Sequence, residues 1–345
     1  MTSIGRISTG RPPLFGFAIV LMAAAMFGTL GPLSNFAYDA GMEPVPFVAW
    51  RAFIGAFGTG SFVAWRLARG GERLVSLRDL RGRERATLAI ACACAAGLNV
   101  AMFIAFDRIT IALALLCFYT YPAMVAGLDI ARGREVLDRS KWIALGLALG
   151  GMVAVVASQL EPAAGITLDG LGVVLSLVAA VFQAVFVTVS RGGYRRIPAD
   201  QATTLILVSS VVACIVLAAV TGTGEAIVLP LAQPSLLPLL LFTGLFAAAI
   251  PSVSFLIGIR VIGGTRAGVV MLFEPVVGVA LAAILLGESL EPIQLLGGVA
   301  ILAGALILQR TTPLGDPSAT PVTGPLDHPD PVEEETLALR VPGGP

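Results

Sequence analysis

Apolar residues in this chain form long continuous runs that short polar segments separate. Each run is roughly 20 residues long, the length that a helix needs to cross a hydrocarbon core of about 30 Å. The runs are continuous rather than alternating, and every backbone group in lipid needs a partner within its own segment, so helices are favoured over a β-barrel. We therefore predict an all-α integral membrane protein with ten transmembrane helices, at about 14–36, 46–65, 86–106, 109–128, 142–159, 171–189, 202–220, 236–259, 267–286 and 293–309.

The composition supports a membrane class and argues against a cofactor. Of the 345 residues, 57% are hydrophobic and 13% are charged, against about 25% charged in soluble domains. The first run follows two arginines but is too long for a signal peptide and has no clear cleavage site. The only histidine, His328, lies outside the runs, the cysteines form no CxxC pair, and no GxxxxGK[ST] loop occurs. We expect no metal, no cofactor and no direct use of ATP.

Basic residues are distributed unequally between the two sides of the predicted bundle. All 22 Lys and Arg residues except Arg51 and Arg108 lie in the tails or in loops after even-numbered runs. Cationic loops stay in the cytoplasm, so both termini are predicted to be cytoplasmic. A basic loop can also bind anionic lipid or nucleic acid, but retention needs no further assumption, so the bilayer is the expected partner and nucleic acid is not. Heavy use of Arg, Ala and Gly is typical of a GC-rich bacterial genome, hence of a plasma (inner) membrane.

The two halves of the chain repeat the same order of features. Pro122 precedes Glu135 by thirteen residues, and Pro275 precedes Glu288 by the same interval. A unit of five helices crosses the membrane an odd number of times, so its second copy enters from the opposite side. Inverted repeats are typical of secondary transporters, because two similar halves can expose a shared midplane site to either side in turn. The alternative is a duplication that only enlarges the bundle.

These features resemble the EamA domains of the drug/metabolite transporter superfamily. The second half carries Glu274-Pro275 and Gly287-Glu288 as that family usually has them, while the first half has Tyr121 in place of the first glutamate. The resemblance implies a five-helix repeat at 14–159 and a second at 170–309, with movement of small organic solutes. It leaves the solute open.

The segment after the last run, 311–345, is rich in Pro, Gly, Thr and acidic residues. Such a composition cannot bury enough apolar surface to fold, so we predict a disordered cytoplasmic tail.

Glu274 is the main candidate for chemistry, because a carboxylate at membrane depth is costly and usually functional. It lies about eight residues, or roughly 12 Å, into its helix. Pro275 cannot donate to the Met271 carbonyl, and Pro122 leaves another carbonyl free in the first half, so we predict two helix kinks that border a cavity. Kinks used only for packing are the alternative. The residues expected beside the first kink are Tyr119, Thr120 and Tyr121.

Other polar residues within the runs are Asn99, Gln183 and Ser252. Each is either a ligand contact or a hydrogen-bonding link between helices. Gly146 and Gly150, together with Gly297-Gly298, allow close helix approach, either within the bundle or between the protomers of a homodimer. We interpret these glycines as structural.

Arg51 lies about six residues, roughly 9 Å, inside the outer end of its run. Long cationic side chains near helix ends usually extend to the interface, and this interpretation is favoured. If Arg51 turns inward instead, the cavity holds one positive and one negative group among aromatic walls. Such a cavity suits a zwitterion or an amphiphilic amine, whereas a phosphorylated metabolite needs several cations at depth.

The function that we predict is secondary transport of amino-acid-like or amphiphilic small molecules by alternating access. We expect export, although the residues themselves do not fix the direction. Burial disfavours an ionised carboxyl group, so Glu274 is predicted to take up and release a proton during the cycle. A channel or scaffold is the alternative. An enzyme is disfavoured because no run holds two carboxylates or a histidine.

The topology can be tested with a cysteine introduced at Gly71, within the basic loop 66–85. Because this loop is predicted to be cytoplasmic, a membrane-impermeant thiol reagent should label the cysteine in permeabilised cells but not in intact cells. Strong labelling of intact cells would overturn both the orientation and the inverted-repeat argument.

Overall fold

The computed structural model describes residues 14–71, 73–106, 108–109, 111–134, 138–158, 169–222, 224–286 and 291–310. Within these ranges the regular structure is helical throughout, and ten segments are long and apolar enough to cross a membrane, which confirms the prediction of ten spans. Glu135, Glu288 and the predicted tail 311–345 lie outside the described residues.

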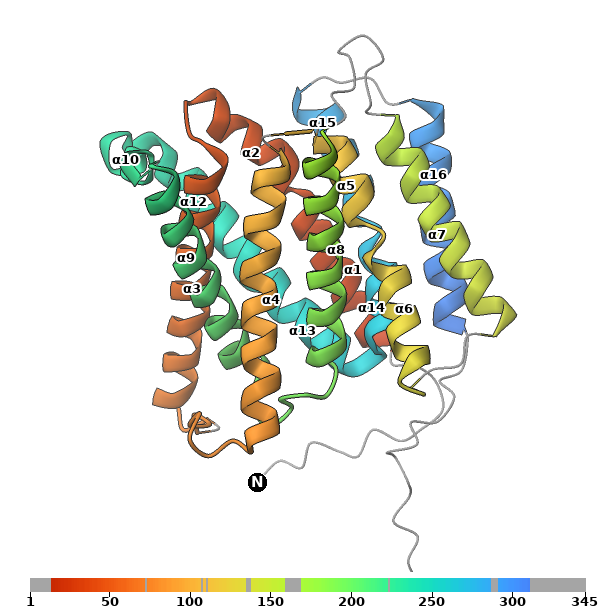
Figure 1. Ribbon diagram of the computed structural model, residues 1–345, viewed down its shortest axis with the longest axis horizontal. Helices are drawn as coiled ribbons and strands as arrows, with labels where there is room; N and C mark the ends of the chain where they lie inside the picture. Colours follow the sequence, from red (N-terminus) through yellow and green to blue (C-terminus); the bar gives the residue numbers. More distant parts are fainter. Residues whose placement is uncertain are drawn as a thin grey trace, which may run out of the picture. The chain divides into compact units, whose positions relative to one another are not determined.

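The helices follow the chain in the order labelled in Figure 1. The first five spans are built from α1 Leu14–Gly28 with α2 Leu30–Asp39, α3 Pro44–Ala68, α4 Gly82–Phe106, α5 Ile111–Phe118 with α6 Tyr121–Ala131, and α7 Arg139–Ala157. Spans six and seven are α8 Gly170–Ser190 and α9 Ala199–Thr221, followed by the short helices α10 Gly224–Ile227 and α11 Leu229–Ala232. Span eight joins the 3₁₀ turn η2 Pro234–Leu236, α12 Leu237–Gly244, the π-helical turn η3 Leu245–Ala249 and α13 Ile250–Ile262. Span nine joins α14 Gly264–Met271 and α15 Glu274–Leu286, and span ten is α16 Pro292–Arg310.

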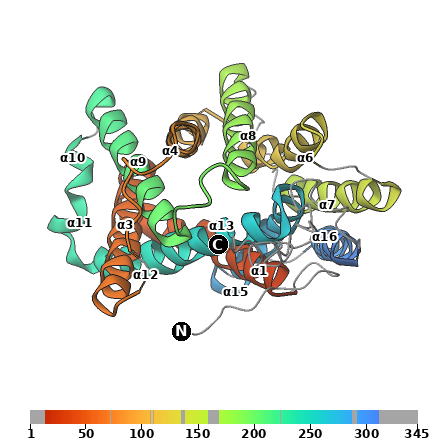
Figure 2. The same ribbon diagram turned by 90° about the horizontal axis from the view of Figure 1, so that it is seen from below.

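Helix pairing follows the inverted symmetry of the two halves. The fifth span packs on the tenth (α7 on α16) and the second on the seventh (α3 on α9), so each of these pairs joins equivalent helices. The third span packs on the sixth (α4 on α8), and its counterpart is the packing of the eighth on the first (α13 on α1). Figures 1 and 2 show the same pairs side by side, with α7 and α16 together at one end of the bundle. The ten spans are thus two inverted repeats of five.

Four spans change helical path in mid-membrane, and each has a proline close by. Proline lacks an N–H group and clashes with the carbonyl four residues earlier, which interrupts an α-helix. The breaks lie at Thr29, at Tyr119–Thr120, at the π-helical turn Leu245–Ala249 and at Leu272–Phe273, and the prolines are Pro32, Pro122, Pro251 and Pro275. Two of these breaks occupy equivalent places in spans four and nine.

The contact between α7 and α16 depends on glycine. A Cβ atom at Gly151 would lie 2.5 Å from the Gly297 carbonyl oxygen, and one at Gly297 would lie 2.5 Å from the Gly151 carbonyl oxygen. The two backbones therefore approach as only glycine permits. Gly146 and Gly150 have no described atom within 4 Å of an added Cβ, so the prediction that they allow close approach within the bundle is wrong for the described part of the chain. Contact between protomers at these positions stays a prediction.

Polar contacts join the helix ends on the lower face, as Figure 1 is drawn. The Arg66 Nε donates to the Asp200 carboxylate at 2.9 Å and connects α3 to α9. The Arg260 guanidinium donates to the Ile197 carbonyl at 2.9 Å and lies over the ring of Tyr194. Burial raises the pKa of Tyr194 to about 12, so its phenol stays neutral. These contacts hold the lower ends of spans two, seven and eight and the segment before α9 together.

Candidate substrate site

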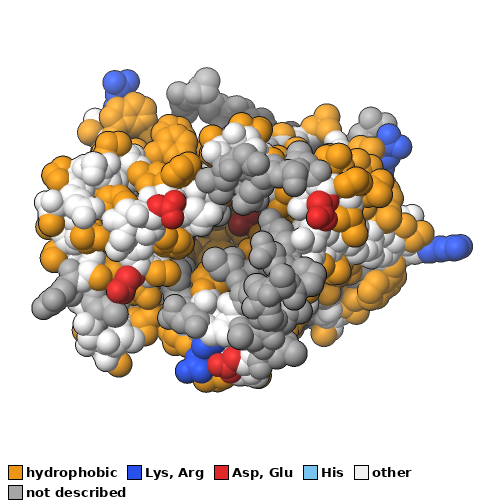
Figure 3. All heavy atoms as spheres, turned by 90° about the horizontal axis from the view of Figure 1, so that it is seen from above, with side chains coloured by type: hydrophobic (Ala, Val, Ile, Leu, Met, Phe, Trp, Pro, Cys, Tyr) orange, Lys and Arg blue, Asp and Glu red, His pale blue; other side chains and the backbone are white. Residues whose placement is uncertain are grey.

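Two neighbouring cavities lie among the broken helices. The smaller has a volume of about 290 Å³ and the larger about 500 Å³. They share six lining residues, Phe27, Leu30, Val48, Arg51, Phe106 and Glu274. The larger cavity is also lined from α2 and by Pro44 at the start of α3, so it extends toward the upper face. Figure 3 shows that this face is hollowed between the helices, with an acidic side chain visible at depth.

Glu274 is the first residue of α15, immediately after the break in span nine. Its span runs from Gly264 to Leu285. Glu274 lies ten residues after the lower end of the span, or about 15 Å above it, near mid-depth. Tyr119, at the equivalent break of span four, lines the larger cavity together with Glu274. Gly28 of α1 packs against the same turn, because a Cβ there would lie 2.6 Å from the Glu274 carbonyl oxygen. The two broken spans and α1 thus hold the carboxyl group between the cavities.

Arg51 turns inward from α3, so the favoured interpretation of a side chain extended to the interface is wrong. Its side chain is half-buried, with Nε fully covered, and lines both cavities. The Arg51 Nη1 donates to the Ala247 carbonyl at 3.4 Å. That carbonyl lacks an α-helical donor because Pro251, four residues later, has no N–H group. Both cavities are thus lined by one acidic and one basic side chain, Glu274 and Arg51.

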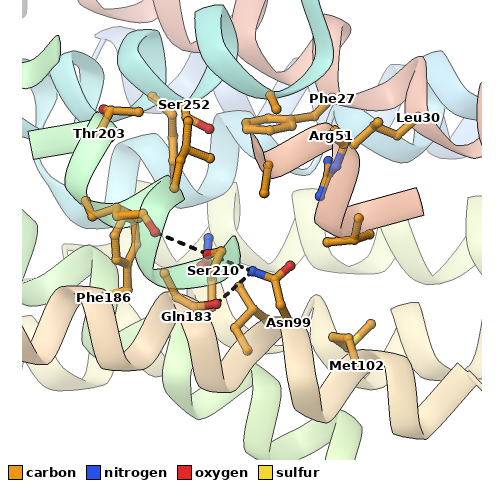
Figure 4. Close-up of a pocket in the computed structure, with 18 of the residues that line it drawn as sticks. Phe27, Leu30, Arg51, Asn99, Met102, Gln183, Phe186, Thr203, Ser210 and Ser252 are labelled. Atoms are coloured by element: carbon orange, nitrogen blue, oxygen red, sulfur yellow. Dashed lines mark hydrogen bonds between the residues drawn. The ribbon is translucent and has the colours of Figure 1, made fainter. Parts of the chain in front are cut away.

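Polar side chains form one wall of the smaller cavity. The Asn99 Nδ2 donates to the Ser210 hydroxyl at 3.2 Å and to the Ala95 carbonyl at 2.8 Å, as the dashed lines in Figure 4 show. Gln183 and Tyr121 line the same cavity. Asn99 links two helices and faces the cavity at the same time, which combines the two interpretations that the sequence left open for it.

The sequence profile of the EamA-like transporter family matches residues 14–157 and 170–310. The chain belongs to this family. An uncharacterized transporter of Archaeoglobus fulgidus is 26% identical over 308 residues, which cover 86% of this chain and 97% of the relative. One crystal structure of a protein aligns with 85% of this chain and 94% of its own, with a TM-score of 0.68 and 19% identity. At that identity the likeness concerns the fold alone.

The remaining predicted residues of this EamA-like transporter lie in different surroundings. Tyr121 and Ser252 line the smaller cavity, and Pro275 lines the larger one. Thr120 lines neither, because its hydroxyl donates to the Cys117 carbonyl at 2.6 Å within the break. Pro122 packs against α14 instead: a Cβ at Gly268 would lie 3.4 Å from it.

Several polar residues of the transporter site do not stand out from the sequence. Thr203 and Ser210 of α9 line the smaller cavity, and Ser34 and Tyr38 of α2 line the larger one. Thr203 and Ser210 are seven residues apart, and Ser34 and Tyr38 are four apart, so each pair lies on one helix face. That these faces line the cavities is visible only in the tertiary structure. In the described part of the chain, no group of three His, Cys, Asp or Glu side chains is placed to hold a metal ion.

The interaction between Arg51 and Glu274 can be measured with a double-mutant cycle. Removing one partner leaves the other charge buried, whereas removing both avoids that cost. Arg51→Gln and Glu274→Gln should each lower the unfolding temperature in detergent. The double variant should lower it by less than the sum of the two single effects, which corresponds to a coupling of about 1–3 kcal/mol.

The exposed pair Arg108–Asp169, at 2.8 Å on the upper face, gives a matched control. Water screens such a pair, so Arg108→Gln and Asp169→Asn should add without measurable coupling. If the two cycles give the same result, Arg51 and Glu274 do not act as a pair.

Proposed function

We propose that this EamA-like transporter is a secondary exporter of small amino-acid-like or amphiphilic solutes. The observation that carries the proposal is the presence of Arg51 and Glu274 on the walls of both cavities. A solute with a carboxylate and an amine can pair with the first and the second respectively. Aromatic walls supply apolar contact for the rest of the solute, as is usual in small-molecule sites.

The two charges belong to different repeats, which supports alternating access. Arg51 lies in α3 of the first repeat and Glu274 in α15 of the second. A zwitterion bound to both would bridge the halves, and a movement of one half against the other would expose it to the opposite side. The described conformation, with its upper hollow and its lower polar contacts, suits the state that opens upward.

Proton coupling follows from competition at one carboxyl group. The Glu274 carboxylate can bind either a proton or the cationic amine of the solute, and each displaces the other. A proton that enters from the outer side would therefore release the solute there. This exchange of an entering proton for a leaving solute is antiport, and it favours export. We also infer that the lower face, with the basic loop, is cytoplasmic and that the membrane is the plasma membrane of a bacterium.

Exchange in proteoliposomes tests the substrate class. We expect saturable exchange of at least one zwitterionic amino acid and no exchange of a sugar phosphate or nucleotide sugar above protein-free liposomes. The pairing with one arginine cannot offset the free-energy cost of burying a doubly charged phosphate. Arg51→Gln should lower amino-acid exchange at least tenfold.

The control variant is Arg108→Gln, which removes an exposed arginine outside both cavities and should exchange at the wild-type rate. Exchange of the sugar phosphate at rates that match the best amino acid would defeat the proposal. Linear, unsaturable flux without acceleration by solute on the opposite side would indicate a channel instead.

The role of Glu274 is tested by efflux under an imposed pH difference. In the wild type, an external medium more acidic than the interior should accelerate efflux of the exchanged amino acid, because protons displace the amine from Glu274 at the outer side. Glu274→Gln should abolish this dependence on the pH difference.

Asp169→Asn is the matched carboxyl control. The hydrogen bonds that Arg108 and the Leu171 N–H donate to Asp169 lower its pKa, so this carboxylate remains ionised throughout the assay. Its variant should keep the wild-type response. An unchanged response in Glu274→Gln would mean that coupling does not pass through this residue.

A further inference from the structure

Two buried threonines of the described spans, Thr203 and Thr265, have a hydroxyl without a hydrogen-bond partner, and of the two only Thr203 lines a cavity. The Thr203 side chain lines the smaller cavity, the residue is 2% exposed, and its hydroxyl has no hydrogen-bond partner among the described residues. Thr59, Thr188 and Thr243 instead donate to the carbonyl four residues earlier in their helices. A buried hydroxyl without a partner is costly, so it calls for a specific explanation.

A second unpartnered group lies at the opposite side of the same cavity. The Arg51 Nε is buried and has no hydrogen-bond partner in the described part of the chain. Figure 4 shows Thr203 and Arg51 on opposite sides of the pocket, with Ser210 and Gln183 between and below them. The cavity therefore offers unused hydrogen-bonding capacity at both ends.

The distance between the two ends follows from helix geometry. Thr59 of α3 and Thr204 of α9 share a hydrogen bond of 2.9 Å between their hydroxyls, so they mark one level of this antiparallel pair. Arg51 lies eight residues above Thr59, and Thr203 lies one residue below Thr204. At about 1.5 Å per residue, Arg51 and Thr203 are roughly 13 Å apart along the bundle axis.

The wall between the two ends is mainly apolar. Ile206, Leu207, Phe255 and Leu256 line this part of the cavity. A volume of about 290 Å³ lies just below the roughly 300–1,000 Å³ of pockets for drug-sized ligands, so it suits a solute of about amino-acid size. An elongated solute with polar groups at both ends and an apolar middle would match this distribution.

We propose that Thr203 selects amino-acid-like solutes whose side chain ends in a hydroxyl or amide group. This inference rests on the proposed function, which places the carboxylate of the solute at Arg51. With the carboxylate there, the side chain of the solute extends down the cavity and presents its terminal polar group to the Thr203 hydroxyl. The hydroxyl can donate to a carbonyl oxygen or accept from an O–H or N–H group.

Two pairs of amino acids test whether the position of a polar group matters. In one pair the group is far from the zwitterionic head, and in the other it is close to the head. Tyrosine and phenylalanine differ by a hydroxyl at the far end of the side chain, where Thr203 can bind it. Threonine and valine differ by a hydroxyl close to the zwitterionic head, which cannot reach Thr203. The measured quantity is the concentration of each amino acid that half-inhibits exchange of a radiolabelled amino acid in proteoliposomes.

In the wild type, tyrosine should inhibit at a lower concentration than phenylalanine. Thr203→Val, which keeps the shape and removes the hydroxyl, should reduce this preference by about three- to tenfold, the usual worth of one neutral hydrogen bond. Thr203→Ser should retain the preference. In every variant the ratio between threonine and valine should stay the same.

Thr243→Val is the control for loss of a buried threonine hydroxyl. Thr243 is fully buried, and its hydroxyl already bonds to the Leu239 carbonyl at 2.9 Å. This variant should leave the preference for tyrosine unchanged. Without solute, Thr203→Val should unfold at the wild-type temperature or above it, because it removes an unpartnered polar group, whereas Thr243→Val should unfold at a lower temperature.

Each result distinguishes this inference from the proposed function. An unchanged preference in Thr203→Val, with exchange intact, would overturn the role of Thr203 and leave the transport of amino acids in place. A loss of apo stability in Thr203→Val with no change of preference would show a structural role only. Absence of exchange for every amino acid in the wild type would overturn the proposed function, and this inference with it.

Discussion

Every backbone carbonyl inside a membrane needs a hydrogen-bond donor, and this constraint shapes the whole structure. Pro122, Pro251 and Pro275 have no N–H group, so three carbonyls near the middle of spans four, eight and nine lack their α-helical donor. Interrupted backbone is stable at that depth only where protein or a water-filled cavity surrounds it. The breaks therefore gather around the two cavities instead of facing lipid. One of these carbonyls, that of Ala247, accepts from Arg51, and this contact holds a cationic side chain inside the bundle.

The helices of the two repeats are arranged symmetrically, but their chemistry is not. Spans four and nine break at equivalent places, yet only the second carries a carboxylate there, Glu274, while the first has Tyr119, which lines the same larger cavity. Arg51 has no counterpart in the second repeat, since the apolar run 202–220 contains no charged residue. Each repeat therefore contributes one charge to the shared site. Under the proposed function, a relative movement of the halves changes the interaction between the two charges, so the same pair would link substrate binding to conformation.

Much of this architecture could be predicted from the sequence, because the features that determine it are local. Length and apolarity specify the ten spans, and a proline breaks its own helix whatever surrounds it. Glu274 could be found for the same reason, since a carboxylate in an apolar run is exceptional wherever it points.

The position of Arg51 could not be predicted from its depth alone. A rule based on distance from the helix end favours extension to the interface, but the deciding contact is the Ala247 carbonyl, which lies 196 residues away along the chain. Thr203 was missed for a related reason. Most threonines in these spans bond within their own helix, and only tertiary packing reveals that this one does not.

Under the proposed function, the balance of charge in the cavities also limits which solutes can bind there. With Arg51 and Glu274 both ionised, the empty site carries one positive and one negative side chain. A zwitterion adds no net charge, so its binding to this ionised pair leaves the net charge of the site unchanged. The contact from Arg51 to the Ala247 carbonyl is long, at 3.4 Å, and a carboxylate in its place would form a shorter, charge-assisted bond. A phosphate ester would instead leave at least one excess negative charge in a largely apolar space, where the cost of burial exceeds what a single guanidinium recovers.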